Sequence, residues 1–243
     1  MKHILTTLVL LSGLTLSAQT KSIHQNLKRV QIDTSYSAFF NYDDKSCVLL
    51  NMPCHKLAKT DTFRCTDGEE LAYWTKLGLY KTPQFKDTLV IIYTDGMSAD
   101  PQFTLATKQG KELMRVNATD FSINSTGIIY TSGHTNNMYN KRRKFVIQQD
   151  TALEVKQPYY YVGLKGKLLK SATLYRDKTG KDIVASLSKD YEIEILLAES
   201  TSKDFEMEYL FLARTEFGLV GWLRLSNTDL DNSLLEGLYY AGD

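Results

Sequence analysis

The sequence has almost no net charge: its 243 residues include 29 Lys and Arg against 28 Asp and Glu. Lys2 is the only one of these in the first 18 residues, so a mature chain starting at Gln19 would carry 28 of each sign. A balanced chain without a basic tail lacks the electrostatic footprint of a nucleic-acid-binding protein. We therefore expect no nucleic acid among its partners.

Long apolar runs are missing after the first 18 residues. The run from Ile4 to Leu16 follows a short basic start at Lys2 and ends in small residues before Gln19, as secretory signals do. An uncleaved N-terminal anchor is the alternative, whereas a lipid anchor is not expected because no Cys follows the run. The signal end also resembles those of exported proteins from Bacteroidetes-like bacteria. We expect residues 1–18 to be a signal peptide, the mature protein to be periplasmic or extracellular, and no membrane span to remain.

Cysteine is scarce, and the three cysteines lie close together in sequence at Cys47, Cys54 and Cys65. An oxidising compartment favours one disulfide among them and leaves one buried thiol. The alternatives are a metal site that includes His55 and a catalytic thiol. The spacing fits no paired Cys-x-x-Cys zinc signature, so we expect no metal.

Familiar catalytic motifs are also absent. The chain contains no Gly-x-Ser-x-Gly elbow, no His-Glu-x-x-His helix and no Gly-rich phosphate loop. These absences favour a noncatalytic protein that needs no cofactor.

What is present is a mainly β pattern. In residues 19–155, short β-branched or alternating runs separated by turn signals predict a β-meander. One short helix is predicted at Glu69–Leu77, where acidic residues precede a face formed by Leu71, Trp74 and Leu77. The expected strands are Leu27–Ile32, Tyr36–Phe40, Thr88–Tyr93, Phe103–Thr107, Leu113–Val116, Ile128–Thr131, Lys144–Gln148, Thr151–Val155 and Tyr159–Val162.

The richest polar cluster lies between two of these strands, over residues 132–144. Its amide, imidazole and guanidinium groups are suited to an anion or a sugar; the candidate ligands are His134, Asn136, Asn137, Arg142 and Arg143. The alternative is a solvated hairpin loop with a basic edge strand. Tyr160 follows within a run of three tyrosines, which suits either a glycan platform or a seam between domains.

Residues 171–225 carry a different pattern. Tyr191, Ile193, Ile195 and Leu197 alternate with acidic residues, which predicts a half-buried strand. Residues 209–213 are apolar on both faces, and Gly218 belongs to a turn before a return strand that contains Trp222. Short strands at this spacing predict a small barrel.

The same stretch resembles a bacterial SH3-like domain. The resemblance rests on Leu174-Tyr175-Arg176, the alternating strand after residue 190, and the closing pair Gly221-Trp222. Asp190 stands where the family usually has Gly, and the polar insertion at residues 200–208 is longer than usual. The resemblance implies an SH3-like barrel in residues 156–243. At the end of this region, the helical spacing of Leu230, Leu234, Leu235 and Leu238 predicts a short helix at residues 228–240.

Family members bind cell-wall peptide or glycan, or pack against a neighbouring domain. The resemblance therefore implies a noncatalytic envelope protein whose module binds such ligands or another envelope protein, or packs against the N-terminal domain. Tyr175 and Trp222 are the candidate ligand residues in it. The alternative is a cell-wall hydrolase that uses the module for targeting. Alternation places Trp222 on the face opposite Leu219, Leu223 and Leu225, where we expect it to pack rather than to bind.

Overall fold

The computed structural model describes residues 26–53, 74–95, 100–133, 137–199, 208–226 and 234–240. These residues form strands, turns and irregular segments, so the mainly β class predicted from the sequence is confirmed. Within these ranges no helix is present, and hence none with the length and apolar character needed to span a bilayer. The strands belong to three sheets, none of which closes into a barrel.

Six strands make the first sheet, in the order β1-β2-β8-β9-β10-β11. Neighbours pair antiparallel except β2 and β8, which pair parallel with Phe40 opposite Phe121. This one parallel contact joins segments about 80 residues apart in the chain. The strands are β1 Lys28–Asp33, β2 Ala38–Tyr42, β8 Asp120–Ile123, β9 Ile128–Ser132, β10 Arg143–Gln148 and β11 Thr151–Glu154.

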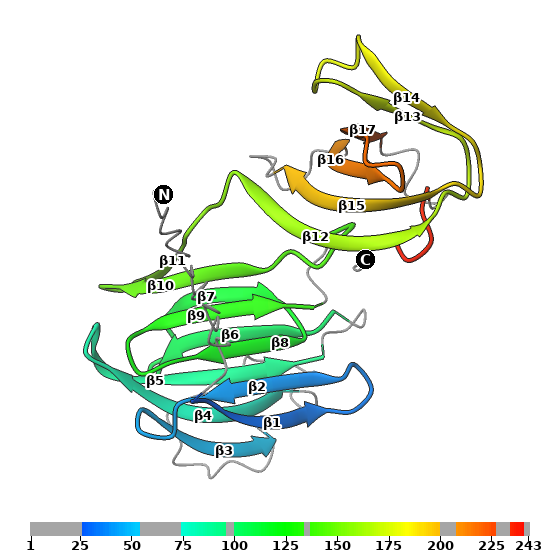
Figure 1. Cartoon of the computed structure of the whole chain (residues 1–243). Coiled ribbons are helices and arrows are strands. Elements are labelled where there is room, and N and C mark those ends of the chain that lie inside the picture. Colours follow the sequence, from blue (N-terminus) through cyan, green and yellow to red (C-terminus); the bar gives the residue numbers. More distant parts are fainter. Residues whose placement is uncertain are drawn as a thin grey trace, which may run out of the picture.

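The second sheet is an antiparallel meander of five strands in chain order, β3-β4-β5-β6-β7. It lies against the first sheet, and the two form the lower body in Figure 1. The predicted β-meander is therefore divided between two layers. The strands are β3 Cys47–Pro53, β4 Trp74–Thr82, β5 Phe85–Thr94, β6 Gln102–Thr107 and β7 Glu112–Asn117.

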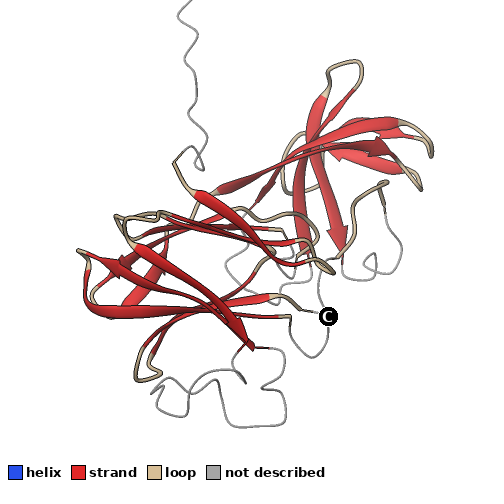
Figure 2. Cartoon of the chain, turned by 90° about the horizontal axis from the view of Figure 1, so that it is seen from below, coloured by secondary structure: helices blue, strands red, loops and turns tan. Residues whose placement is uncertain are grey.

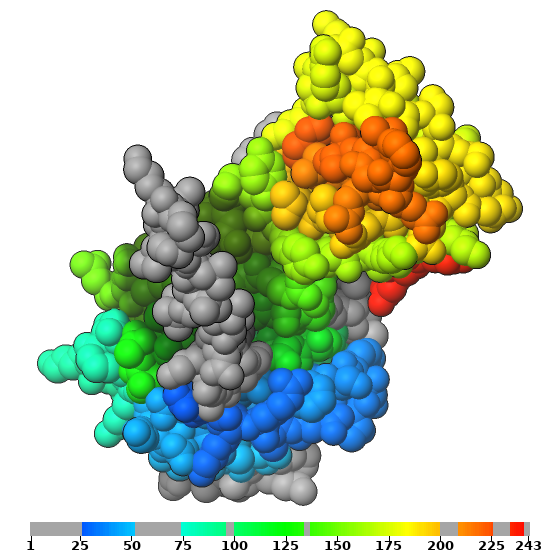
Figure 3. All heavy atoms as spheres, viewed as in Figure 1, coloured from blue at the N-terminus to red at the C-terminus, as the bar shows by residue number. Residues whose placement is uncertain are grey.

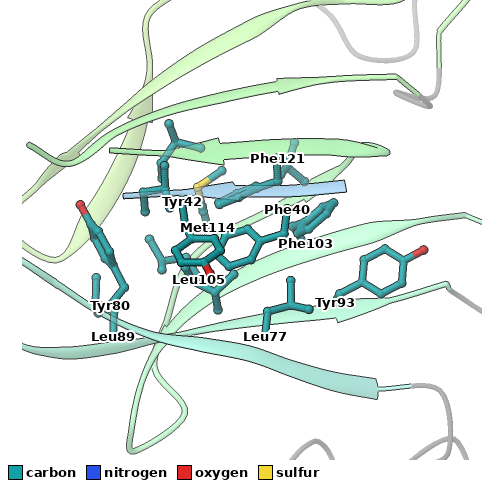
Figure 4. Packing of buried hydrophobic residues seen from close by; sticks show 14 of the residues in the cluster. Phe40, Tyr42, Leu77, Tyr80, Leu89, Tyr93, Phe103, Leu105, Met114 and Phe121 are labelled. Atoms are coloured by element: carbon teal, nitrogen blue, oxygen red, sulfur yellow. The ribbon is translucent and has the colours of Figure 1, made fainter. Parts of the chain in front are cut away.

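The core of this sandwich is aromatic. The rings of Phe103 from the second sheet and Phe121 from the first stack with centroids 4.9 Å apart. Figure 4 shows Phe40 and Phe121 pointing toward Leu77 and Leu89 of the facing sheet, and all four are fully buried. Burial of apolar surface between the two sheets holds them together.

The segment Trp74–Leu77 is part of strand β4, so the helix predicted at Glu69–Leu77 is wrong over these four residues; residues 69–73 lie outside the described ranges. In a helix Trp74 and Leu77 would share a face, but three positions along a strand place them on opposite faces. Leu77 enters the sandwich core, whereas Trp74 packs with Val90, Ile92 and Ala106 in a small cluster on the other side of the sheet. Two-sided burial of β4 overrides the helical spacing.

The third sheet contains six strands in the order β12-β15-β16-β17-β13-β14 and forms the upper body in Figure 1. All its pairs are antiparallel. Strands β12 and β14 are its edges, so the barrel closure predicted for this region is not formed. The strands are β12 Tyr159–Lys167, β13 Ala172–Tyr175, β14 Ile183–Leu187, β15 Glu192–Glu199, β16 Glu208–Thr215 and β17 Val220–Ser226.

A final segment, residues 234–240, lies beside the end of β12. Leu235 forms a bridge with Leu168, and the backbone nitrogen of Leu169 donates to the carbonyl of Leu234. The predicted helix over residues 228–240 is not found in this described portion. Leu234, Leu235 and Leu238 are nevertheless buried, because they fill the core of the third sheet.

The sandwich and the third sheet meet through the loop before β10. Met138 and Tyr139 of this loop are buried in the core of the third sheet. The rings of Tyr139 and Phe211 meet edge-on there, with their centroids 5.9 Å apart. The view from below in Figure 2 shows the two strand-rich bodies adjoining each other. In Figure 3 the lime-green residues of β12 lie between the sandwich and the yellow and orange part of the third sheet.

Candidate functional site

Strand β17 places Trp222 on the outside of the third sheet. Leu223 and Leu225 are buried in the core, while Trp222, one residue away, points to the other face and is half-buried. This alternation is as predicted for these three residues. Leu219 differs: it precedes β17 in the turn and is 40% exposed, so it does not fill the core.

Beside Trp222 lie one further ring and one cation. The ring centroids of Trp222 and Tyr159 are 6.2 Å apart, and the Lys178 ammonium is 4.8 Å from the Trp222 centroid and 5.1 Å from that of Tyr159. A cation this close to two ring faces is attracted by both quadrupoles. We call Tyr159, Lys178, Glu199 and Trp222 the aromatic–cation surface.

Glu199 holds Lys178 in place. The Lys178 ammonium donates to the Glu199 carboxylate and, at 3.4 Å, to the Tyr159 hydroxyl, while Tyr159 pairs with Glu199 across strands β12 and β15. The hydrogen bond to Glu199 raises the pKa of Lys178 above its ordinary value, so the ammonium stays charged at neutral pH. The surface therefore presents a fixed cation and a fixed carboxylate beside two rings.

The turn that carries Lys178 is itself ordered by side-chain hydrogen bonds. The Asp177 carboxylate accepts from the backbone nitrogen and the hydroxyl of Thr179, which lowers the pKa of Asp177. Arg224 donates to the Lys178 carbonyl at 2.7 Å. Asx-type bonding of this kind is what Asp contributes to tight turns.

Gly221 allows strand β13 to approach β17 closely. A Cβ at this position would lie 2.9 Å from the Leu174 Cβ and 2.9 Å from the Tyr175 carbonyl oxygen. The absence of a side chain brings the half-buried Tyr175 into register opposite Trp222. The Gly-Trp pair therefore has a steric role as well as an aromatic one.

The other predicted ligand residues lie elsewhere. Tyr160 is 2% exposed and donates its hydroxyl to Glu154, which makes it part of the seam between the two bodies. Asn137 lines a pocket of about 620 Å³ at the same seam. Arg142 and Arg143 line a pocket on the first sheet. His134 and Asn136 lie outside the described residues.

The structure thus brings together Tyr175 and Trp222 among the predicted ligand residues, and separates these two from Asn137, Tyr160, Arg142 and Arg143. Tyr159, Lys178 and Glu199 are absent from the residues predicted from the sequence. Lys178 lies in the turn after β13, and its proximity to Trp222 depends on β12, β13 and β17 belonging to one sheet.

The cysteines supply no catalytic centre in the described part of the chain. Cys47 is buried and not disulfide-bonded, so neither of the predicted pairs that include it is formed; Cys54, Cys65 and the candidate ligand His55 lie outside the described residues. Burial raises the pKa of the Cys47 thiol to about 12, which suppresses the thiolate that a nucleophile needs. No group of three His, Cys, Asp or Glu side chains suited to a metal ion occurs among the described residues.

Comparison with known proteins adds no relative. No protein-family model matches the chain, and searches of curated proteins and of solved structures also find no match.

Proposed function

We propose that this protein is a noncatalytic, exported envelope protein whose third sheet is an SH3-like module that binds cell-wall glycan. The observation that supports this proposal is the aromatic–cation surface, in which the half-exposed rings of Tyr159 and Trp222 flank Lys178 and Glu199. Sugar C–H faces pack on aromatic rings, and a neighbouring carboxylate and ammonium hydrogen-bond sugar hydroxyls.

The SH3-like assignment is supported by the strand sequence. Strands β15, β16 and β17 form an antiparallel meander, and β13 crosses next to β17 at the Gly221-Trp222 pair. Tyr175 and Trp222, two residues on which the resemblance rests, lie on β13 and β17 and are paired in register. We infer an open form of the module whose core also receives Met138 and Tyr139 from the sandwich.

The alternative, a cell-wall hydrolase that uses this module for targeting, is less well supported. A hydrolase of the cysteine type needs an accessible, ionisable thiol, whereas Cys47, the cysteine within the described residues, is buried with a raised pKa. The core of the module also receives Tyr139 from the sandwich, which leaves the aromatic–cation surface on its outer face.

Co-sedimentation with purified cell-wall sacculi tests the proposal. We expect the mature protein to sediment with the sacculi, and Trp222→Ala to weaken this binding about tenfold, the equivalent of roughly 1.4 kcal/mol. Phe217→Ala is the matched control, because Phe217 is an 84% exposed aromatic in the turn before β17 and is not part of the surface. Unchanged sedimentation of a folded Trp222→Ala variant would reject the proposal.

Export is tested separately. The N-terminal mass of protein from a fractionated native host is expected to correspond to a start near Gln19. Protein that retains Met1 and remains in the cytoplasm would contradict the export part of the proposal.

A further inference from the structure

The outer face of the first sheet carries a pocket that is separate from the aromatic–cation surface. Its volume is about 480 Å³, within the range of roughly 300–1,000 Å³ that is usual for small-ligand sites. The residues that matter for its chemistry are Ser122, Tyr130, Ser132, Arg142, Lys144 and Gln157.

Strand register explains why these side chains meet. Tyr130 pairs with Ser122 on β8 and with Lys144 on β10, so the three stand in one row across the sheet. Period-two alternation places Ser132 on the same face as Tyr130, and Arg142 on the same face as Lys144. The opposite face of these strands, with Ile129 and Phe145, is buried in the sandwich core.

The pocket has an excess of positive charge. On the face that carries the pocket, the lining has two cations, Arg142 and Lys144, and one acidic residue, Asp120; Arg143 alternates to the face of Phe145. Asp120 is already neutralised, because it pairs with Arg29 at 2.9 Å and accepts a hydrogen bond from Asn41 at 2.7 Å. The Asp120 carboxylate is therefore already engaged and does not pair with Arg142 or Lys144.

Two of these cations lack a carboxylate partner within the described structure. Lys144 is half-buried; its backbone carbonyl accepts from Val155, but its ammonium has neither a hydrogen bond nor an ion pair among the described residues. Arg142 donates to the Tyr161 carbonyl at 3.4 Å and lies 5.7 Å from the Tyr161 ring centroid, contacts that leave its charge uncompensated. A half-buried ammonium is stabilised when an anion approaches it.

We propose that this pocket binds a carboxylate-bearing sugar. Lys144 and Arg142 hold the carboxylate, and the Ser132 hydroxyl and the Gln157 amide hydrogen-bond the ring hydroxyls. The Tyr130 ring, beside Val155, offers an apolar surface for the C–H face of the sugar. This site lies on a different sheet from Trp222 and does not rest on the function proposed above.

Calorimetric titration of the mature full-length chain tests this inference, with digalacturonate as the acidic probe. Digalactose and inorganic phosphate serve as comparison probes for the sugar and for the charge alone. We expect digalacturonate to bind more tightly than either, and its affinity to fall as salt is raised. Phosphate binding as tight as that of digalacturonate, or equal binding of digalactose, would overturn the assignment of the ligand class.

The test variant is the double substitution Arg142→Ala with Lys144→Ala, which we expect to weaken digalacturonate binding at least tenfold. Its matched control is Lys108→Ala with Lys189→Ala, which removes the same charge from two exposed turns. An equal loss in both double variants, or no loss in the first, would overturn the proposal.

Discussion

The environment of Cys47 determines its chemistry. Its side chain lies in the sandwich core, and its sulfur is close to Gly78 on the neighbouring strand; a Cβ on Gly78 would be 2.9 Å from it. A thiolate here would lose its hydration without gaining a cation. The residue therefore behaves as a small apolar group.

We expect native Cys47 to resist alkylation at pH 8.5. A rise of its pKa from 9.0 to about 12 lowers the thiolate population roughly a thousandfold. Mass spectrometry of the peptide that contains Cys47, after labelling of native and of denatured protein, measures this. Rapid labelling of the native protein, in a state shown to be folded by circular dichroism, would contradict the burial.

The same shift makes stability depend on pH. Above pH 9 the thiol ionises in the unfolded chain but not in the folded one, so its contribution to stability is complete below pH 9 and is lost as pH rises toward 12. We expect the unfolding free energy of the wild type to fall more steeply over this interval than that of Cys47→Ala. Denaturant melts of both proteins at several pH values provide the comparison, and parallel curves would refute the assignment.

At the scale of elements, period-two alternation predicted the buried face of β15 only up to an irregularity in its pairing. In β15, Ile193 and Ile195 are buried as predicted, but a register shift lies between Ile195 and Leu197. Ala198 takes the next buried position, and Leu197 is only partly buried. A β-bulge of this kind reverses the faces of all later residues, and side-chain pattern alone does not reveal it.

The strands predicted from the sequence do not include β3, β4, β8 or β14. β8 is four residues long and is stabilised by pairing with β2 and β9 rather than by its own composition. β4 is buried on both faces, so it lacks alternation and permits a helical reading. In both cases the long-range partner decides the structure.

Substitution of Gly221 tests how closely strands β13 and β17 pack. Gly221→Ala is expected to destabilise the protein by about 1–3 kcal/mol, since its new methyl group would meet both Leu174 and the Tyr175 backbone at 2.9 Å. Thermal melting measures the loss, and Val220→Ala, at a 45% exposed neighbouring position, is the control. Equal melting midpoints for Gly221→Ala and wild type would show that β13 and β17 are not so closely packed.

At the scale of the whole molecule, the loop before β10 couples the two bodies. The sequence analysis left this loop either as a ligand site or as a solvated hairpin. Its described part instead buries Met138 and Tyr139 in the core of the third sheet. The centroid of the Tyr139 ring lies 6.3 Å from that of Tyr160 and 5.9 Å from that of Phe211. Burial of these two side chains gives the bodies a shared apolar contact.

Tyr139→Ala is therefore expected to destabilise the third sheet by about 3 kcal/mol or more, the range for removal of a large buried aromatic. Loss of this shared contact should also separate the unfolding of the two bodies. Differential scanning calorimetry is expected to show one transition for the wild type and two for the variant. Leu153→Ala, at a 49% exposed position of β11, is the control; a single unshifted transition in Tyr139→Ala would contradict the coupling.

Local pattern along the chain was sufficient for the strand-rich class, most of the individual strands and the outward orientation of Trp222. Alternation and turn residues are encoded within a few consecutive positions, so no distant partner is needed to recognise them. Only the folded molecule shows the parallel pairing of β2 with β8, the open third sheet, the burial of Tyr139 and the meeting of Lys178 with Trp222. Each of these depends on contacts between segments far apart in sequence, whose free energy comes from shared burial and strand pairing rather than from the preference of either segment alone.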